Sequence, residues 1–268
     1  MRRILLILPA VLLLSTPLLI AQRQDLSESR WKVGEVERTA LVHRPDLQAE
    51  ETAPLIFVWH GHGGSAKRTA RKLDLHRLWP EAIVVYPQGL KTPSYYDSEG
   101  KRSGWATTTD PKSNRDLAFF DAMLKSFREK GIVDERRIHS TGHSNGGGFT
   151  YVLLFERGEI FASIAPSSAG AGRKYRGRKP VHIPVFHLAG KTDTVVPMRW
   201  QQPVINALQR HNECADGTIW RQHPQCTIYP SKLNAPLVTY IHPGGHRMPQ
   251  DAGSLFVKFF QEHPRPAK

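Results

Sequence analysis

Short runs of apolar and β-branched residues alternate along the chain with segments of helical spacing. Two continuous apolar runs, residues 55–60 and 83–86, predict strands buried on both faces. The same pattern predicts further strands at residues 137–143, 161–165, 181–188 and 236–242, and an edge hairpin at 31–42. Pro184 weakens the 181–188 run as a central strand, because proline cannot donate a ladder hydrogen bond.

Three segments are predicted to be helices. One follows Ser113, a candidate N-cap, and ends before Gly131. Its apolar stripe consists of Leu117, Phe120, Leu124 and Phe127. The others cover residues 198–210 and 252–262. Strands alternating with helices predict an α/β fold with a mostly parallel central sheet and helices on both faces.

The amino terminus has the pattern of a secretory signal peptide over residues 1–21. Arg2 and Arg3 precede the apolar stretch 4–20, and Ala21 is a small residue at the expected cleavage point. The alternative, a membrane anchor, is disfavoured because the stretch is short and contains two prolines. We therefore expect a secreted or periplasmic protein with no stable membrane insertion after cleavage. Residues 22–268 are long enough for one large α/β domain with a full core.

Charge and cysteine content narrow the possible partners. The formal net charge is +13, and loss of Arg2 and Arg3 with the leader leaves +11. The basic residues are scattered except for a cluster at 173–179, and no nucleic-acid motif accompanies them, so nucleic acid is not an expected partner. Cys214 and Cys226 are the two cysteines, and such a pair in an exported protein predicts a disulfide bond.

The pentapeptide 142–146, Gly-His-Ser-Asn-Gly, is the strongest chemical signal. It lies between a predicted strand and a helix start, the setting in which a G-x-S-x-G serine becomes a nucleophile. The glycines permit a tight turn that holds the Ser144 hydroxyl at the end of the sheet. A serine needs a base, and the base needs a third group to orient it.

The chain order serine, acid, histidine selects partners for Ser144. Asp193 follows a predicted strand directly and is preferred over Asp216 and Asp251. His246 lies in a glycine-rich loop after the last strand, with His242 as its main rival. These positions predict a Ser144–Asp193–His246 triad, in which His246 is the base.

Two backbone N–H groups are expected to form an oxyanion hole. One belongs to Asn145, which follows the nucleophile, and the other is assigned to His62 in the loop 60–64. The alternative, a metal site at His60 and His62, lacks further ligands at a suitable spacing. No metal and no cofactor are predicted.

At these residues the chain resembles the secreted esterase family of polyhydroxybutyrate depolymerases, feruloyl esterases and acetylxylan esterases. The resemblance is carried by residues 60–63, 86–89, 114–119, 133–147, 190–197 and 244–249. It implies the α/β-hydrolase fold and the same triad, and it places the segment around Trp105 at the border of the acyl or sugar site. Met248 and His62 depart from the residues that many members have, tryptophan and cysteine, which leaves the substrate class open.

The resemblance implies a serine carboxylic ester hydrolase that acts through an acyl-enzyme. Short-acyl or aromatic-acyl esters are the expected substrates, whether small or attached to plant polysaccharide or polyester. The segment 166–180 is too short for a helical lid, so no large lid is expected. Two alternatives stay open: a serine peptidase of the same fold, and a catalytically silent binding protein on this scaffold.

Overall fold

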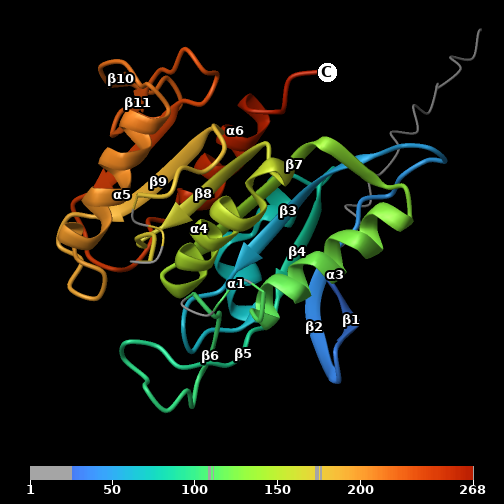
Figure 1. Ribbon diagram of the computed structural model, residues 1–268. Coiled ribbons are helices and arrows are strands. Elements are labelled where there is room, and N and C mark those ends of the chain that lie inside the picture. The colour runs from blue at the N-terminus through green and yellow to red at the C-terminus, as the bar shows by residue number, and fades with distance from the viewer. Residues whose placement is uncertain (1–25, 108–109, 111, 173–174, 176, 268) are drawn as a thin grey trace, which may run out of the picture.

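A ten-stranded sheet forms the centre of the computed structural model (Figure 1). The structure describes residues 26–107, 110, 112–172, 175 and 177–267. The predicted signal peptide lies outside these residues. The strand order is β1-β2-β4-β3-β7-β8-β9-β12-β11-β10.

The six strands in the middle of the sheet are mutually parallel, as the sequence predicts. In spatial order they are β4 (Ile83–Pro87), β3 (Ala53–Trp59), β7 (Val133–His143), β8 (Ser163–Ser167), β9 (Val185–Gly190) and β12 (Leu237–His242). Antiparallel pairs cover both edges. The edge strands are β1 (Ser27–Val33) with β2 (Val36–His43), and β10 (Thr218–Ile219) with β11 (Cys226–Tyr229).

Helices cover both faces of the sheet, and each face has its own apolar core. On one side pack α3 (Arg115–Glu129), α4 (Asn145–Arg157) and α5 (Met198–His211). On the other pack α1 (Ala66–Leu73), α2 (Leu75–Leu78) and α6 (Ala252–Glu262). Strand β3 supplies both cores by simple alternation: Leu55, Phe57 and Trp59 face the first, and Ile56 and Val58 face the second. This arrangement is the α/β-hydrolase fold.

Three short elements complete the fold. A two-stranded hairpin of β5 (Leu90–Lys91) and β6 (Ser103–Gly104) carries the long loop seen at one end of Figure 1. A 3-10 turn, η1 (Gly158–Ile160), follows α4. The described residues between β8 and β9 contain no α-helix, and no helix in the described part of the chain is long and apolar enough to cross a membrane.

Two predicted element boundaries are wrong by a few residues. The N-cap of α3 is Asn114, because its side chain accepts hydrogen bonds from the Asp116 and Leu117 amides, so Ser113 is not the cap. Strand β9 begins at Val185 and not at residue 181, because Pro184 cannot continue the ladder.

The predicted disulfide between Cys214 and Cys226 is also wrong in this structure, where both are free thiols. Cys226, in β11, is buried in the core under α6. Cys214 packs against the core on the opposite face of the sheet. The two cysteines therefore pack against different cores, on opposite faces of the sheet.

Candidate active site

Ser144 occupies the turn between β7 and α4 in a strained backbone conformation. Its φ of 58° and ψ of −119° are unfavourable for a residue with a side chain. Hydrogen bonds on both sides hold the turn, from the Ser144 amide to the Ser167 carbonyl and from the Gly148 amide to the Ser144 carbonyl, each 2.8 Å. A Cβ atom at Gly142 would meet the Gly146 carbonyl, and one at Gly146 would meet the Trp59 carbonyl, which explains the two glycines.

Asp193 and His246 form the hydrogen bond expected of an acid and its base. Asp193 Oδ2 lies 2.8 Å from His246 Nδ1, and Asp193 Oδ1 accepts the Val195 and Val196 amides at 2.9 Å each. Asp193 is buried, whereas the His246 side chain is 24% exposed. When Nδ1–H donates to the carboxylate, His246 Nε2 is the nitrogen left to accept a proton.

The loops that carry these two residues are joined through their backbones. The Thr192 amide donates to the Gly244 carbonyl at 3.1 Å, and the Lys191 amide donates to the His242 carbonyl at 2.8 Å. Within the described residues, no hydrogen bond joins His246 to the Ser144 hydroxyl. Such bonds often form only in the presence of substrate.

The rival residues are placed elsewhere. His242 is buried at the end of β12, where its Nδ1 accepts the Gly244 amide and burial lowers its pKa. Asp216 is exposed on the loop between α5 and β11, and Asp251 pairs with His223 at 3.2 Å. The structure therefore brings together the preferred acid and base, and neither alternative acid contacts His246.

His143, which the sequence analysis did not single out, packs against His246. Their ring centroids are 4.7 Å apart, and His143 Nδ1 lies 3.1 Å from the Ser167 hydroxyl. Burial, with a smaller contribution from the neighbouring His246, lowers the pKa of His143 to about 3. His143 is therefore an uncharged ring that packs beside the candidate base. Its position was the available sequence signal, because His143 directly precedes the candidate nucleophile at the end of a strand.

The two predicted oxyanion donors lie on segments held by side-chain hydrogen bonds. The side-chain carboxamide of Asn145 binds the Trp105 backbone: its Oδ1 accepts from the Trp105 N–H at 2.7 Å, and its Nδ2 donates to the Trp105 carbonyl at 3.0 Å. His62 Nε2 lies 2.9 Å from Asp97 Oδ2, and this hydrogen bond is the main reason that the pKa of Asp97 falls to about 2. In the described structure, the backbone N–H groups of Asn145 and His62 donate to no protein acceptor.

The loop around His62 lies directly against the nucleophile. A Cβ atom at Gly61 would be 3.5 Å from Ser144 Cβ. The next turn is fixed by hydrogen bonds from the Gly63 amide to the Ser103 carbonyl at 2.7 Å and from the Gly64 amide to the Gly61 carbonyl at 2.9 Å. Loop 60–64 is therefore close enough to contribute an amide to a developing oxyanion.

Trp105 does not border the site as predicted, because its side chain is fully buried. Its indole N–H donates to the His60 carbonyl at 2.8 Å, and its ring packs edge-on against Trp59. The segment supports Asn145 from behind. His60 is also structural: its Nε2 accepts the Gly89 amide at 2.9 Å, and burial lowers its pKa.

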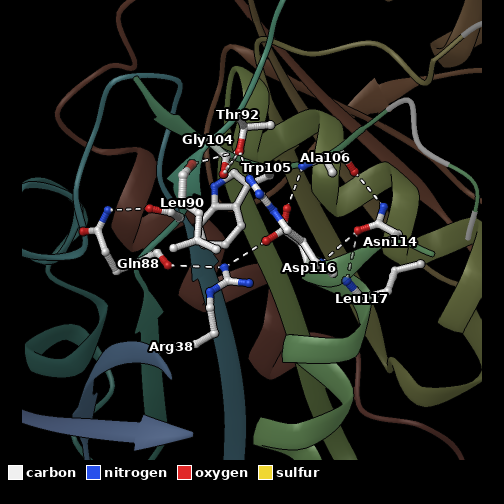
Figure 2. Close-up of polar contacts among 12 residues, drawn as sticks. Arg38, Gln88, Leu90, Thr92, Gly104, Trp105, Ala106, Asn114, Asp116 and Leu117 are labelled. Atoms are coloured by element: carbon white, nitrogen blue, oxygen red, sulfur yellow. Dashed lines mark hydrogen bonds and ion pairs between the residues drawn. The ribbon is translucent and has the colours of Figure 1, made fainter. Parts of the chain in front are cut away.

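A buried polar network anchors the segment that includes Trp105 (Figure 2). Asp116 Oδ2 accepts the Ala106 amide, and Asp116 Oδ1 pairs with Arg38, both at 2.8 Å. Asn114 donates to the Ala106 carbonyl at 2.8 Å. The Arg38 and Asp116 side chains are almost completely excluded from solvent. Nothing in the sequence pattern linked Arg38 to Asp116, which lie 78 residues apart.

A cavity of about 190 Å³ opens beside the nucleophile. Its lining combines the loop 61–64, one side of α1, His143 and Met248. Met248 is buried and stands two residues after the candidate base. Among the residues that the structure describes, no group of three or more His, Cys, Asp or Glu side chains is arranged to hold a metal ion.

Comparison with known proteins points to esterases. The Aspergillus flavus protein named "Probable feruloyl esterase C" is 25% identical over 235 residues, which cover 82% of this chain and 79% of that protein. Feruloyl esterase D of Neurospora crassa is 27% identical over 171 residues, 62% of this chain and 57% of the relative. No family model matches the chain.

Solved structures share the fold at low sequence identity. The acetyl xylan esterase from Aspergillus awamori matches with a TM-score of 0.64 and 13% identity, covering 88% of this chain and 99% of that one. The Bacillus cereus carboxylesterase matches with a TM-score of 0.58 and 16% identity, covering 84% and 94%. The predicted esterase resemblance and α/β-hydrolase fold are confirmed. Together, the relatives and the fold support a carboxylic ester hydrolase.

Proposed function

We propose that the protein is a serine esterase in which Ser144, Asp193 and His246 form the catalytic triad. The observation that carries the proposal is the strained turn at Ser144 together with the 2.8 Å hydrogen bond between Asp193 and His246. The sequence relationship to feruloyl esterases supports ester hydrolysis as the reaction.

In the proposed mechanism, His246 Nε2 removes the proton as Ser144 Oγ attacks the ester carbonyl carbon. The negative oxygen of the tetrahedral intermediate is stabilised by the amides of Asn145 and His62. Asp193 stabilises the imidazolium and keeps the ring oriented. His246 then protonates the departing alcohol, and water hydrolyses the acyl-enzyme by the same steps in reverse.

Short-acyl and aromatic-acyl esters are the proposed substrates. The cavity beside Ser144 is smaller than the roughly 300 Å³ at the lower end of ordinary ligand pockets, so we propose that a long acyl chain fits poorly. The named activities of the relatives favour feruloyl or acetyl groups on plant polysaccharide. We further propose that residues 1–21 direct export to the periplasm or medium. N-terminal sequencing of the mature protein tests this.

The function is tested with the purified mature protein and a panel of aryl acetate, butyrate and ferulate esters, with a peptide anilide alongside. Ester hydrolysis that is lost in a folded Ser144→Ala variant supports the proposal. Cleavage of the anilide in preference to the esters would favour the peptidase alternative. Normal folding with no turnover of any substrate would favour a silent binding protein.

A further inference from the structure

Helix α1, beside the candidate site, has an unusual charge. Its eight residues include Lys67, Arg68, Arg71 and Lys72, with no acidic residue. In the described structure none of these four side chains forms an ion pair or hydrogen bond. Arg247, which directly follows the candidate base, is likewise unpaired there. Like charges four residues apart on a helix repel each other, and a bound anion would reduce this repulsion.

Of these five cations, Arg68 and Lys72 line the cavity, and Lys67, Arg71 and Arg247 do not. Arg68 and Lys72 stand one helical turn apart on the side of α1 that borders the cavity. Thr69 and Leu73 line the cavity next to them. None of the ten lining residues is acidic. Partial burial, with repulsion from Arg247, lowers the pKa of Lys72. Arg68 and Lys72 therefore border a cavity whose lining contains no acidic residue.

The cavity adjoins the segments that surround the candidate nucleophile. Gly61 and His143 line it. A Cβ atom at Gly61 would be 3.5 Å from Ser144 Cβ, and His143 directly precedes Ser144 in the sequence. The cavity therefore lies between Arg68 and Lys72 on one side and the residues next to Ser144 on the other. Apolar surface from Leu73 and Met248 lies next to the cations.

We propose that this cavity binds an anionic substituent of the ester substrate through Arg68 and Lys72. The inference rests on the proposed function and adds a substrate class: esters of compounds that also carry a carboxylate or another oxyanion. Carboxylate, sulfonate and phosphate share the required chemistry, since guanidinium and ammonium groups bind each of them. The cavity volume suits one acidic residue of a larger molecule and not a polymer strand.

The test compares matched neutral and anionic esters. 4-Nitrophenyl butyrate is paired with the 4-nitrophenyl monoester of succinate, which places the charge in the acyl half. Methyl 4-acetoxybenzoate is paired with 4-acetoxybenzoate and with 4-acetoxybenzenesulfonate, both of which carry the negative charge in the alcohol half of the ester. Comparison of these two anionic esters distinguishes a preference for carboxylate from a preference for sulfonate. The readout is the ratio of kcat/KM for the anionic ester to that for its neutral partner.

Arg68→Gln and Lys72→Gln should each lower this ratio about tenfold for at least one pair, because one charge-assisted contact is lost. Lys67→Gln and Arg71→Gln are matched controls with the same charge change on the same helix, away from the cavity. They should change the ratio less than twofold. Equal ratios in the wild type and all four variants, or an equal fall in lining and control variants, would overturn the proposal.

A binding measurement separates this proposal from the proposed function. Calorimetry with Ser144→Ala and 4-hydroxybenzoate needs no turnover. Binding that weakens about tenfold in Ser144→Ala/Lys72→Gln but not in Ser144→Ala/Arg71→Gln supports the anion site even if no ester is hydrolysed. No binding, together with active hydrolysis of neutral esters only, refutes the anion site and leaves the esterase intact.

Discussion

The buried pair of Arg38 and Asp116 should dominate the stability of the region behind the site. The test substitution is Asp116→Asn, which preserves shape but removes the charge. The wild-type carboxylate receives Arg38 on one oxygen and the Ala106 amide on the other, both at 2.8 Å. In asparagine one oxygen becomes an NH₂ group, so one of these two donors must face another donor.

The size of the effect follows from burial. Arg38 is 2% exposed and Asp116 is fully buried, and burial lowers the pKa of Arg38 despite the opposing effect of Asp116. Removal of one partner leaves an uncompensated buried charge, which typically costs about 3–5 kcal/mol. For a domain of this size that cost corresponds to a fall in Tm of roughly 10 °C.

Thermal or urea unfolding measures the effect. The matched control is Arg30→Gln, which breaks the exposed pairs of Arg30 with Glu28 and Glu37 on the β1–β2 hairpin that also carries Arg38, and it should leave Tm unchanged. Addition of Arg38→Met to Asp116→Asn should recover part of the loss, because it removes the unpaired charge. An Asp116→Asn protein as stable as the wild type would refute this account. So would a double variant whose free energy of unfolding lies below that of Asp116→Asn by roughly a further 3–5 kcal/mol.

Three further predictions concern the site, acid stability and the thiols. Asp193→Asn and His246→Ala should each lower kcat on an aryl acetate by about 10⁴-fold, whereas His242→Ala should change it only a few-fold; an inactive His242→Ala beside an active His246→Ala would show that the wrong histidine was chosen. Burial lowers the pKa of His139 to about 3, so as the pH falls the unfolded state binds this proton before the folded state does. The contribution of His139 to the free energy of unfolding is therefore complete above about pH 6.5 and declines toward pH 3 by about 1.4 kcal/mol per pH unit. Urea unfolding at a series of pH values should show that the free energy of unfolding falls less steeply with decreasing pH in His139→Gln than in the wild type. The same pH dependence in both proteins would contradict this. The protein unfolded without reductant should give two reactive thiols, one each from Cys214 and Cys226, and the absence of reactive thiol would restore the disulfide.

The parallel core of the sheet could be predicted from the sequence because its strands are buried on both faces. Continuous apolar runs such as residues 55–60 leave no polar face, and only a sheet covered by helices on both sides accommodates them. The order of Ser144, Asp193 and His246 was also predictable, since each follows a parallel strand and such strands end at the same edge.

Long-range side-chain contacts could not be predicted in the same way. The α1 segment is short and its composition resembles a solvated loop, so its cations gave no sign that two of them border a cavity. The disulfide failed because sequence spacing does not tell on which face of a strand a cysteine lies. Trp105 was placed at the site because its segment lies there, yet its ring is turned into the core.

The β5–β6 hairpin loop links two parts of the candidate site that come from distant strands. Asp97 binds the His62 ring on the oxyanion side, and the hydroxyl of the adjacent Tyr96 donates to the Val195 carbonyl at 2.8 Å. Val195 itself donates its amide to Asp193. One loop therefore joins the candidate oxyanion segment to the candidate acid. Because both contacts come from neighbouring residues, a shift of this loop would disturb both at once, which makes its rigidity part of how the site is preorganised.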